Sequence, residues 1–325
     1  MIVFITVHGH GYCVDGLKKF PFDPEGIPIV SDVSYERLFR LEELPRATYV
    51  FVDVERLYPW ERGLAAECFR SMKAAGLRCL NDPARILTRY PLLRTLAAEG
   101  VVPYNIYRAD DVPKPTRFPV FIRRESDHAE PNPHLINSQR ELEHHLSRMV
   151  EAGWPLADCL VVEYVDCRNA NGLWTKSSVY RVGNSYHYDH FFIKDEWIVK
   201  VYSGTAHLWT EELFQEERQK VEANEVSHEI VRAFEVSGVE YGRADFAHVS
   251  GRDVLFEINT NPRIMELPEP TSFRLETRVM ARRRLAQLLG GIETASGGRV
   301  RPVPGPRLSR FRQQNSDPRR PVVRP

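Results

Sequence analysis

The chain has 325 residues, of which 42% are hydrophobic and 27% charged, values typical of a soluble globular protein with a substantial core. Its net charge is zero, but residues 296–325 hold eight Arg, six Pro and one Asp, so the acidic remainder is not a general binder of polyanions. No stretch approaches the roughly 20 apolar residues of a membrane span. Five scattered cysteines, without paired metal spacing, argue against zinc and disulfides and favour reduced thiols in the cytoplasm.

The first part of the chain predicts a small α/β domain over residues 1–83. Residues 2–7 and 49–54 are short apolar runs typical of buried parallel strands. Residues 61–75 place their apolar side chains on one helical face, and a glycine follows. Polar side chains come after the first strand, where open α/β sheets bind ligands, so they are candidates for a substrate pocket. These candidates are His8, His10 and Tyr12.

Two further units and a tail follow. Residues 84–163 predict a mixed unit with helices near 85–99 and 139–152 and strands near 118–123 and 159–165. Residues 164–292 predict antiparallel strands, one long amphipathic helix over 210–236, and a last helix over 272–289 that ends at Gly290-Gly291. The composition of residues 293–325 predicts a disordered Arg/Pro-rich tail.

Residues 242–262 carry the most informative pattern. Two alternating runs flank Ser250-Gly251-Arg252-Asp253, which predicts a β-hairpin. With its turn near Gly251, Asp245 lies opposite Glu257, and Arg243 lies opposite Asn259. Alternation would place Phe256 on the opposite face from these four side chains.

Two carboxylates facing each other across a strand pair repel, and a shared cation would remove that repulsion. Mg²⁺ prefers carboxylate and amide oxygens and commonly also binds substrate phosphates. The alternative is a solvated hairpin face that happens to hold these residues, since any half-exposed sheet alternates.

The hairpin resembles the nucleotide and metal site of the ATP-grasp superfamily, which has Arg-x-Asp followed, about a dozen residues later, by Glu-x-Asn-x-x-Pro. The resemblance implies an ATP-grasp fold of mixed α/β class, with the N-terminal α/β domain, a lid subdomain (84–163) and a C-terminal antiparallel-sheet subdomain (164–292). It implies that Mg²⁺, or Mn²⁺ in its place, is held with ATP by Asp245, Glu257 and Asn259. It also implies that Arg243 faces the transferred phosphoryl group.

Family landmarks imply further nucleotide contacts. Arg89 and Arg123 stand where the family usually has phosphate-contacting lysines, which keeps the charge but changes a compact ammonium into a planar fork. The segment Glu163-Tyr164-Val165-Asp166 resembles the linker between lid and C-terminal subdomain, with the first three residues near adenine and Asp166 near ribose. Lys200 is the candidate for γ-phosphate among several cations of the antiparallel region. A surface or core role remains the alternative for each of these residues.

The resemblance implies an ATP-dependent ligase that activates a carboxylate as an acyl phosphate for attack by an amine. Its substrates would be two small molecules, and the protein would form a homodimer, as relatives do. No membrane or nucleic acid would take part. The chain departs from the family in having no Gly-rich loop at residues 124–131 and in carrying Arg263 where a glycine often follows the last proline. The first departure favours a second hypothesis, a non-catalytic nucleotide sensor of the same fold. The residues identify neither substrate.

Overall fold

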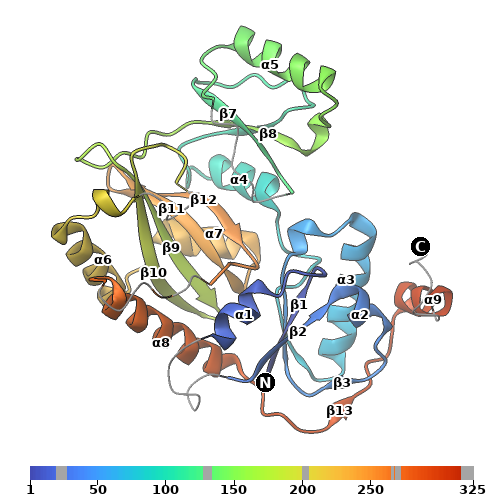
Figure 1. Cartoon of the computed structure of the whole chain (residues 1–325). Coiled ribbons are helices and arrows are strands. Elements are labelled where there is room, and N and C mark those ends of the chain that lie inside the picture. The colour runs from blue at the N-terminus through green and yellow to red at the C-terminus, as the bar shows by residue number, and fades with distance from the viewer. Residues whose placement is uncertain (20–27, 127–133, 200–204, 265–266, 268–271, 316–325) are drawn as a thin grey trace.

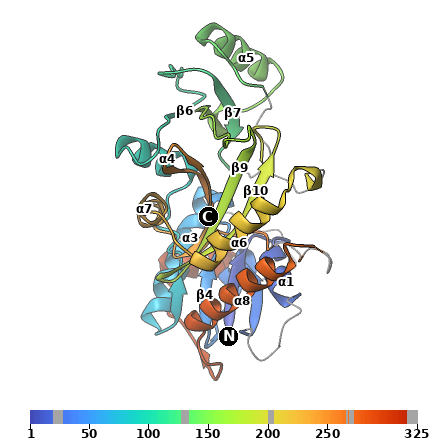
Figure 2. The same ribbon diagram turned by 90° about the vertical axis from the view of Figure 1, so that its left-hand side faces the viewer.

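The computed structural model describes residues 1–325 except 20–27, 127–133, 200–204, 265–266, 268–271 and 316–325. Three sheets form separate units, with the lid sheet at one end of the molecule, the parallel sheet near the other, and an antiparallel sheet between them (Figures 1 and 2). Their combination of parallel and antiparallel strands with helices agrees with the predicted mixed α/β fold class. Within the described ranges, no helix combines the length and apolar character needed to cross a membrane.

The N-terminal unit is a parallel sheet in the order β2-β1-β4-β5. β1 and β4 are fully buried, as expected for central strands made of Ile, Val, Phe and Tyr. α3 has a proline at its first position and packs its buried face on this sheet. The elements are β1 (Ile2–Thr6), α1 (Tyr12–Lys18), β2 (Val30–Ser34), α2 (Tyr35–Arg40), β3 (Leu44–Pro45), β4 (Thr48–Phe51), α3 (Pro59–Ala74) and β5 (Arg78–Leu80).

The lid is a three-stranded antiparallel sheet in the order β6-β8-β7, backed by one helix. Ser138 caps α5 by accepting a hydrogen bond from the backbone N–H of Glu141, as the capping box predicts. α4 leads into the lid and carries Pro91 in its first turn, where a missing N–H costs nothing. The elements are α4 (Arg89–Ala98), β6 (Ile106–Arg108), β7 (Val120–Arg124), α5 (Gln139–Glu151) and β8 (Cys159–Glu163).

The C-terminal unit is an antiparallel sheet in the order β10-β9-β11-β12. Residues on one of its faces pack with α4, α6 and α7, and residues on the other face pack with α1 and α8. The elements are β9 (Trp174–Val182), β10 (Ser185–Lys194), α6 (Glu211–Ala223), α7 (His228–Ser237), β11 (Tyr241–Val249), β12 (Arg252–Asn259) and α8 (Leu275–Ile292).

Two helix predictions are wrong. The expected single helix over 210–236 is divided, because Asn224 adopts a left-handed conformation with φ of 53° and ends α6. The last helix does not end at Gly290-Gly291 but continues to Ile292. The buried side chains of Leu289 and Ile292 pack against the sheet and hold the final turn in place despite the two glycines.

The prediction of a disordered tail is also wrong for residues 293–315. β13 (Arg299–Val300) pairs with β3. α9 (Pro306–Gln314) packs against α2 and α3, although these two helices lie much earlier in the sequence (Figure 1). Phe311 is buried beside Phe39, at 5.7 Å between ring centroids, and beside Trp60 at 6.3 Å. A few apolar side chains thus order a segment whose composition is otherwise polar.

Candidate functional site

The hairpin has the predicted register at its open end. Arg243 pairs with Asn259, and Asp245 pairs with Glu257, with the turn at Ser250 and Gly251. Both turn residues have positive φ, 51° and 84°, which suits a tight hairpin turn. Two carboxylates from adjacent strands therefore lie side by side on one face of the sheet.

A bulge modifies the simple alternation beyond Asp245. The pairing shifts between Asp245 and Phe246, so β12 carries one extra residue at this point. Phe256, which strict alternation would place on the opposite face, lines the same pocket as Glu257. The bulge thus adds an aromatic side chain to the site.

Asp245 is buried and surrounded by donors. It accepts hydrogen bonds from Ser178 Oγ at 2.9 Å and Arg243 Nε at 2.9 Å, and Lys176 Nζ lies 3.3 Å from its other oxygen. Burial alone would raise the pKa of Asp245, but Arg243 and then Lys176 outweigh it and hold the pKa below its usual range. Asp245 is therefore an ionised carboxylate in a positive environment.

Glu257 is held by two arginines from the lid side. Arg89 Nη2 and Arg123 Nη2 both donate to Oε2, at 2.5 and 2.9 Å. Arg89 also donates to the carbonyl oxygens of Arg124 and Glu125, at 2.9 Å each, so its guanidinium is fixed by the backbone. Burial, followed by the charge of Arg89, lowers the pKa of Arg123. Arg123 lines the pocket, whereas Arg89 lies behind Glu257.

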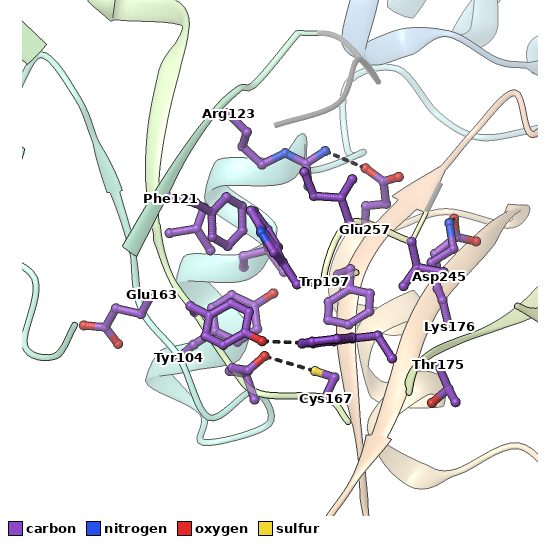
Figure 3. Close-up of a pocket in the computed structure, with 18 residues that line it drawn as sticks. Tyr104, Phe121, Arg123, Glu163, Cys167, Thr175, Lys176, Trp197, Asp245 and Glu257 are labelled. Carbon is purple, nitrogen blue, oxygen red and sulfur yellow. Dashed lines mark hydrogen bonds and ion pairs between the residues drawn. The ribbon is translucent and has the colours of Figure 1, made fainter. Parts of the chain in front are cut away.

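A pocket of about 890 Å³, including its open mouth, separates the lid sheet from the antiparallel sheet. Aromatic side chains from both units fill one end, and Arg123, Lys176, Asp245 and Glu257 lie at the other (Figure 3). Apolar walls with a few polar groups at one end are typical of sites for small organic ligands. The aromatic residues are Tyr104, Phe121, Tyr164, Trp174, Trp197 and Phe256.

The linker residues take different positions. The Glu163 side chain points away from the pocket (Figure 3) and accepts hydrogen bonds from Thr116 Oγ1 at 2.7 Å and Tyr107 at 2.9 Å. Tyr164 and Val165 line the pocket, and the Tyr164 hydroxyl accepts a hydrogen bond from Trp174 Nε1 at 2.9 Å. Glu163 thus orders the lid, and the backbone after it borders the pocket.

The remaining predicted residues differ in how closely they join the site. Asn259 is buried and lies on the same face of the hairpin as Asp245. The carboxylate of Asp166 pairs with Arg168 and is 44% exposed, away from the pocket lining. Lys200 lies outside the described residues.

Ser178 and Trp197 escaped the sequence prediction, which considered Lys176 for γ-phosphate but preferred Lys200. Lys176 and Ser178 lie on β9 next to Asp245, as the pairing of Asp245 with Ser178 requires. Trp197 contacts Phe121, at 5.1 Å between ring centroids, and Tyr164, at 5.8 Å. Alternation along β9 is a signal that favours Lys176, but nothing in the local sequence places Trp197 against the lid.

The oxygen ligands at the polar end fit a magnesium ion that is shared with phosphate. Two carboxylates and an amide, from Asp245, Glu257 and Asn259, are donors that Mg²⁺ prefers. In the described part of the chain, no group of three or more His, Cys, Asp and Glu gathers into a cage for a metal. Mg²⁺ commonly takes one or two carboxylates and completes its shell with water and phosphate, so the observed set suits this mode of binding.

No family model and no curated protein matches the sequence. Solved structures with a similar fold include a D-alanine–D-alanine ligase from Bacillus anthracis complexed with ATP, at 11% identity over 90% of this chain and 95% of that one, with a TM-score of 0.47. A RimK-domain ATP-grasp protein from Sphaerobacter thermophilus is 13% identical over 91% and 100%, with a TM-score of 0.43. The D-cycloserine synthetase DcsG is 14% identical over 88% and 99%, with a TM-score of 0.43. These likenesses concern the fold and not the activity.

Proposed function

We propose that the chain is an ATP-dependent ligase that joins a carboxylate to an amine. The observation that carries this proposal is the opposed pair Asp245 and Glu257 at the cationic end of an aromatic-lined pocket. The aromatic end suits a purine base, and the cations Arg123, Lys176 and Arg243 suit a row of phosphates.

Each carboxylate of the site faces two cationic side chains before any ligand binds. Arg243 and Lys176 face Asp245, and Arg89 and Arg123 face Glu257. Mg²⁺ bound with ATP would neutralise phosphate charge between Asp245, Glu257 and Asn259. Arg123, Lys176 and Arg243 would then turn their donors to phosphate oxygens, so each group exchanges one ionic partner for another without leaving a buried charge unpaired.

The chain's residues serve positioning and charge stabilisation, which are the main needs of phosphoryl transfer. A substrate carboxylate oxygen would attack the γ-phosphorus, the bond to the β-phosphate oxygen would break, and ADP would leave. An amine would then attack the acyl carbon of the acyl phosphate, inorganic phosphate would leave, and the nitrogen would lose a proton. Arg243, which donates to Asp245 and to the Arg263 carbonyl oxygen at 3.2 Å, would stabilise the transferred group.

The test is ADP formation with Mg²⁺, ATP and a small-molecule extract, followed by mass spectrometry of the product. We expect Glu257→Gln to reduce the rate about 100-fold or more, the usual loss when one electrostatic group of a site is removed. The matched control is Glu225→Gln, since Glu225 is exposed and remote from the pocket.

An unchanged rate in Glu257→Gln would show that the metal assignment is wrong. The second hypothesis, a nucleotide sensor, predicts a different result: tight binding of Mg-ATP by the wild type in calorimetry, with no ADP formed in any extract. The two functions are therefore separated by the same preparation of protein.

A further inference from the structure

The carboxylate oxygens of Asp245 are already occupied by cationic donors. Oδ1 accepts hydrogen bonds from Arg243 Nε and Ser178 Oγ, at 2.9 Å each. Oδ2 lies 3.3 Å from Lys176 Nζ and 3.4 Å from Arg243 Nη2. The Asp245 side chain is 3% exposed, so solvent screens these contacts little. A metal ion could therefore reach the lone pairs of Asp245 only by displacing a cation.

Glu257 is occupied in the same way from the lid side. Its Oε2 atom accepts from both Arg89 and Arg123, so the two guanidinium groups meet at a single oxygen. Burial and then the charge of Arg89 lower the pKa of Arg123, since the two like charges repel. Among the described residues, the polar end of the pocket thus holds four cationic side chains against two carboxylates.

This excess of positive charge favours a metal–nucleotide complex over a free metal ion. Free Mg²⁺ would add two charges of the same sign to a buried region, where repulsion is screened weakly. ATP with bound Mg²⁺ is an anion, so it would reduce the excess instead. The displaced cations would then find phosphate oxygens as new acceptors, whereas free Mg²⁺ would leave them buried without a partner, which is costly.

Two of the four cations are held by little besides a carboxylate. Within the described part of the chain, the hydrogen bond to Glu257 is the one that Arg123 makes, and its buried Nε has no hydrogen-bond partner. Lys176 Nζ has Asp245 as its acidic partner and lies 5.6 Å from the centre of the Phe192 ring. Both side chains line the pocket beside the carboxylates (Figure 3).

The other two cations are anchored to the backbone. Arg89 also donates to two backbone carbonyl oxygens of the lid, at 2.9 Å each. Arg243 also donates to the Arg263 carbonyl oxygen at 3.2 Å. Neither can leave its carboxylate without breaking further hydrogen bonds. Arg123 and Lys176 are therefore the side chains most readily transferred to an incoming phosphate.

We propose that Arg123 and Lys176 are tethered counter-ions that keep free divalent metal ions off Glu257 and Asp245 until the phosphates of a nucleotide draw them away. This inference rests on the proposed ligase function and adds an order of binding to it, in which the metal ion enters with the nucleotide and not before it. The exchange runs backwards when the products leave, because the two cations return to the carboxylates and expel the metal ion.

The test is the binding of Mn²⁺ alone to the full chain without nucleotide, followed through the electron paramagnetic resonance signal of free Mn²⁺. We expect the wild type to bind Mn²⁺ weakly and Arg123→Gln to bind it at least tenfold more tightly, because a positive charge beside Glu257 is removed. In calorimetry with Mg²⁺ and a non-hydrolysable ATP analogue, the same variant should bind the nucleotide several-fold more weakly. A purely structural role for Arg123 would weaken both, so the opposite signs identify the proposed role.

Two controls locate the effect. Arg94→Gln removes an equal charge from an exposed position of α4 away from the pocket, and it should leave both affinities unchanged. Adding Glu257→Gln to Arg123→Gln should abolish the gained Mn²⁺ site. Lys176→Gln is a second test, with the same expected gain at Asp245, and it decides the matter if Arg123→Gln does not fold.

The inference is overturned if the nucleotide-free wild type binds Mn²⁺ tightly, or if neither Arg123→Gln nor Lys176→Gln gains affinity for Mn²⁺. Either result leaves the ligase proposal standing when the ATP analogue binds the wild type with Mg²⁺. Failure of the analogue to bind the wild type at all would overturn the proposed function and, with it, this inference.

Discussion

At the residue scale, the two arginines that hold Glu257 have different surroundings. Arg89 is almost completely buried and donates to two backbone carbonyl oxygens in addition to Glu257. Arg123 lines the pocket and has the same Glu257 oxygen as its acidic partner. The family resemblance assigns both to phosphate, but the geometry favours a mainly structural role for Arg89 and a ligand-facing role for Arg123.

Lysine substitutions should separate these roles. A lysine keeps the charge but cannot reproduce the planar fork of arginine. We expect Arg89→Lys to lower the free energy of unfolding by about 2 kcal/mol, because backbone carbonyls lose their donors. Arg123→Lys should raise the KM for ATP several-fold with a smaller change in stability. Chemical denaturation and ATP kinetics on both variants would test this, and equal effects on both quantities would contradict the division.

Glu163 supports a prediction about pH. Burial raises its pKa, but hydrogen bonds from Thr116, Asn105 and Tyr107 outweigh burial and hold the pKa below its usual range. A carboxyl group with a lowered pKa stabilises the folded state above its unfolded pKa of about 4.3, and this contribution is lost as the pH falls through the folded value.

We therefore expect Glu163→Gln to lower the free energy of unfolding by about 2 kcal/mol at neutral pH and by much less near pH 3. Glu151→Gln is the control, because Glu151 is exposed at the end of α5. Denaturant titrations across this pH range give the comparison. A difference between wild type and Glu163→Gln that does not shrink in acid would refute the assigned cause.

At the element scale, Asn224 joins two helices to an edge strand. Its positive φ ends α6, its Oδ1 accepts a hydrogen bond from Tyr188 N at 2.9 Å, and its Nδ2 donates to the Tyr186 carbonyl oxygen at 3.3 Å. Asn224→Ala should lose both bonds and strain the backbone, whereas Asn224→Gly should lose only the bonds. We expect Asn224→Gly to be more stable than Asn224→Ala by about 1 kcal/mol in thermal unfolding, and the reverse order would contradict this account.

The same element shows what the sequence could and could not predict. The hairpin register follows from alternation and a short turn, both of which are local, so Asp245 and Glu257 were correctly placed opposite each other. The bulge that brings Phe256 into the pocket depends on pairing with the neighbouring strand, and the break at Asn224 depends on β10. The orientation of Glu163 depends on a loop nearly fifty residues earlier, and such contacts leave no local pattern.

At the scale of the whole molecule, α9 seals the N-terminal unit from outside. Leu308 and Phe311 are buried, and Leu308 N donates to Glu67 Oε1 at 2.8 Å. We expect Phe311→Ala to lower the free energy of unfolding by about 3–5 kcal/mol, because a large buried ring is removed. Arg310→Ala, at an exposed position on the same helix, should change it by less than about 0.5 kcal/mol. Calorimetry gives both values, and equal stability of the two variants would show that α9 does not hold the unit together.

The return of residues 293–314 to the start of the chain has a consequence for protein synthesis. Thr48 Oγ1 donates to the Ile292 carbonyl oxygen at 2.5 Å, and β13 completes a pair with β3. While the ribosome is still translating the middle of the message, Phe39 and Trp60 have no α9 to cover them. The nascent chain therefore exposes an apolar surface that chaperones can recognise until the last helix emerges from the exit tunnel.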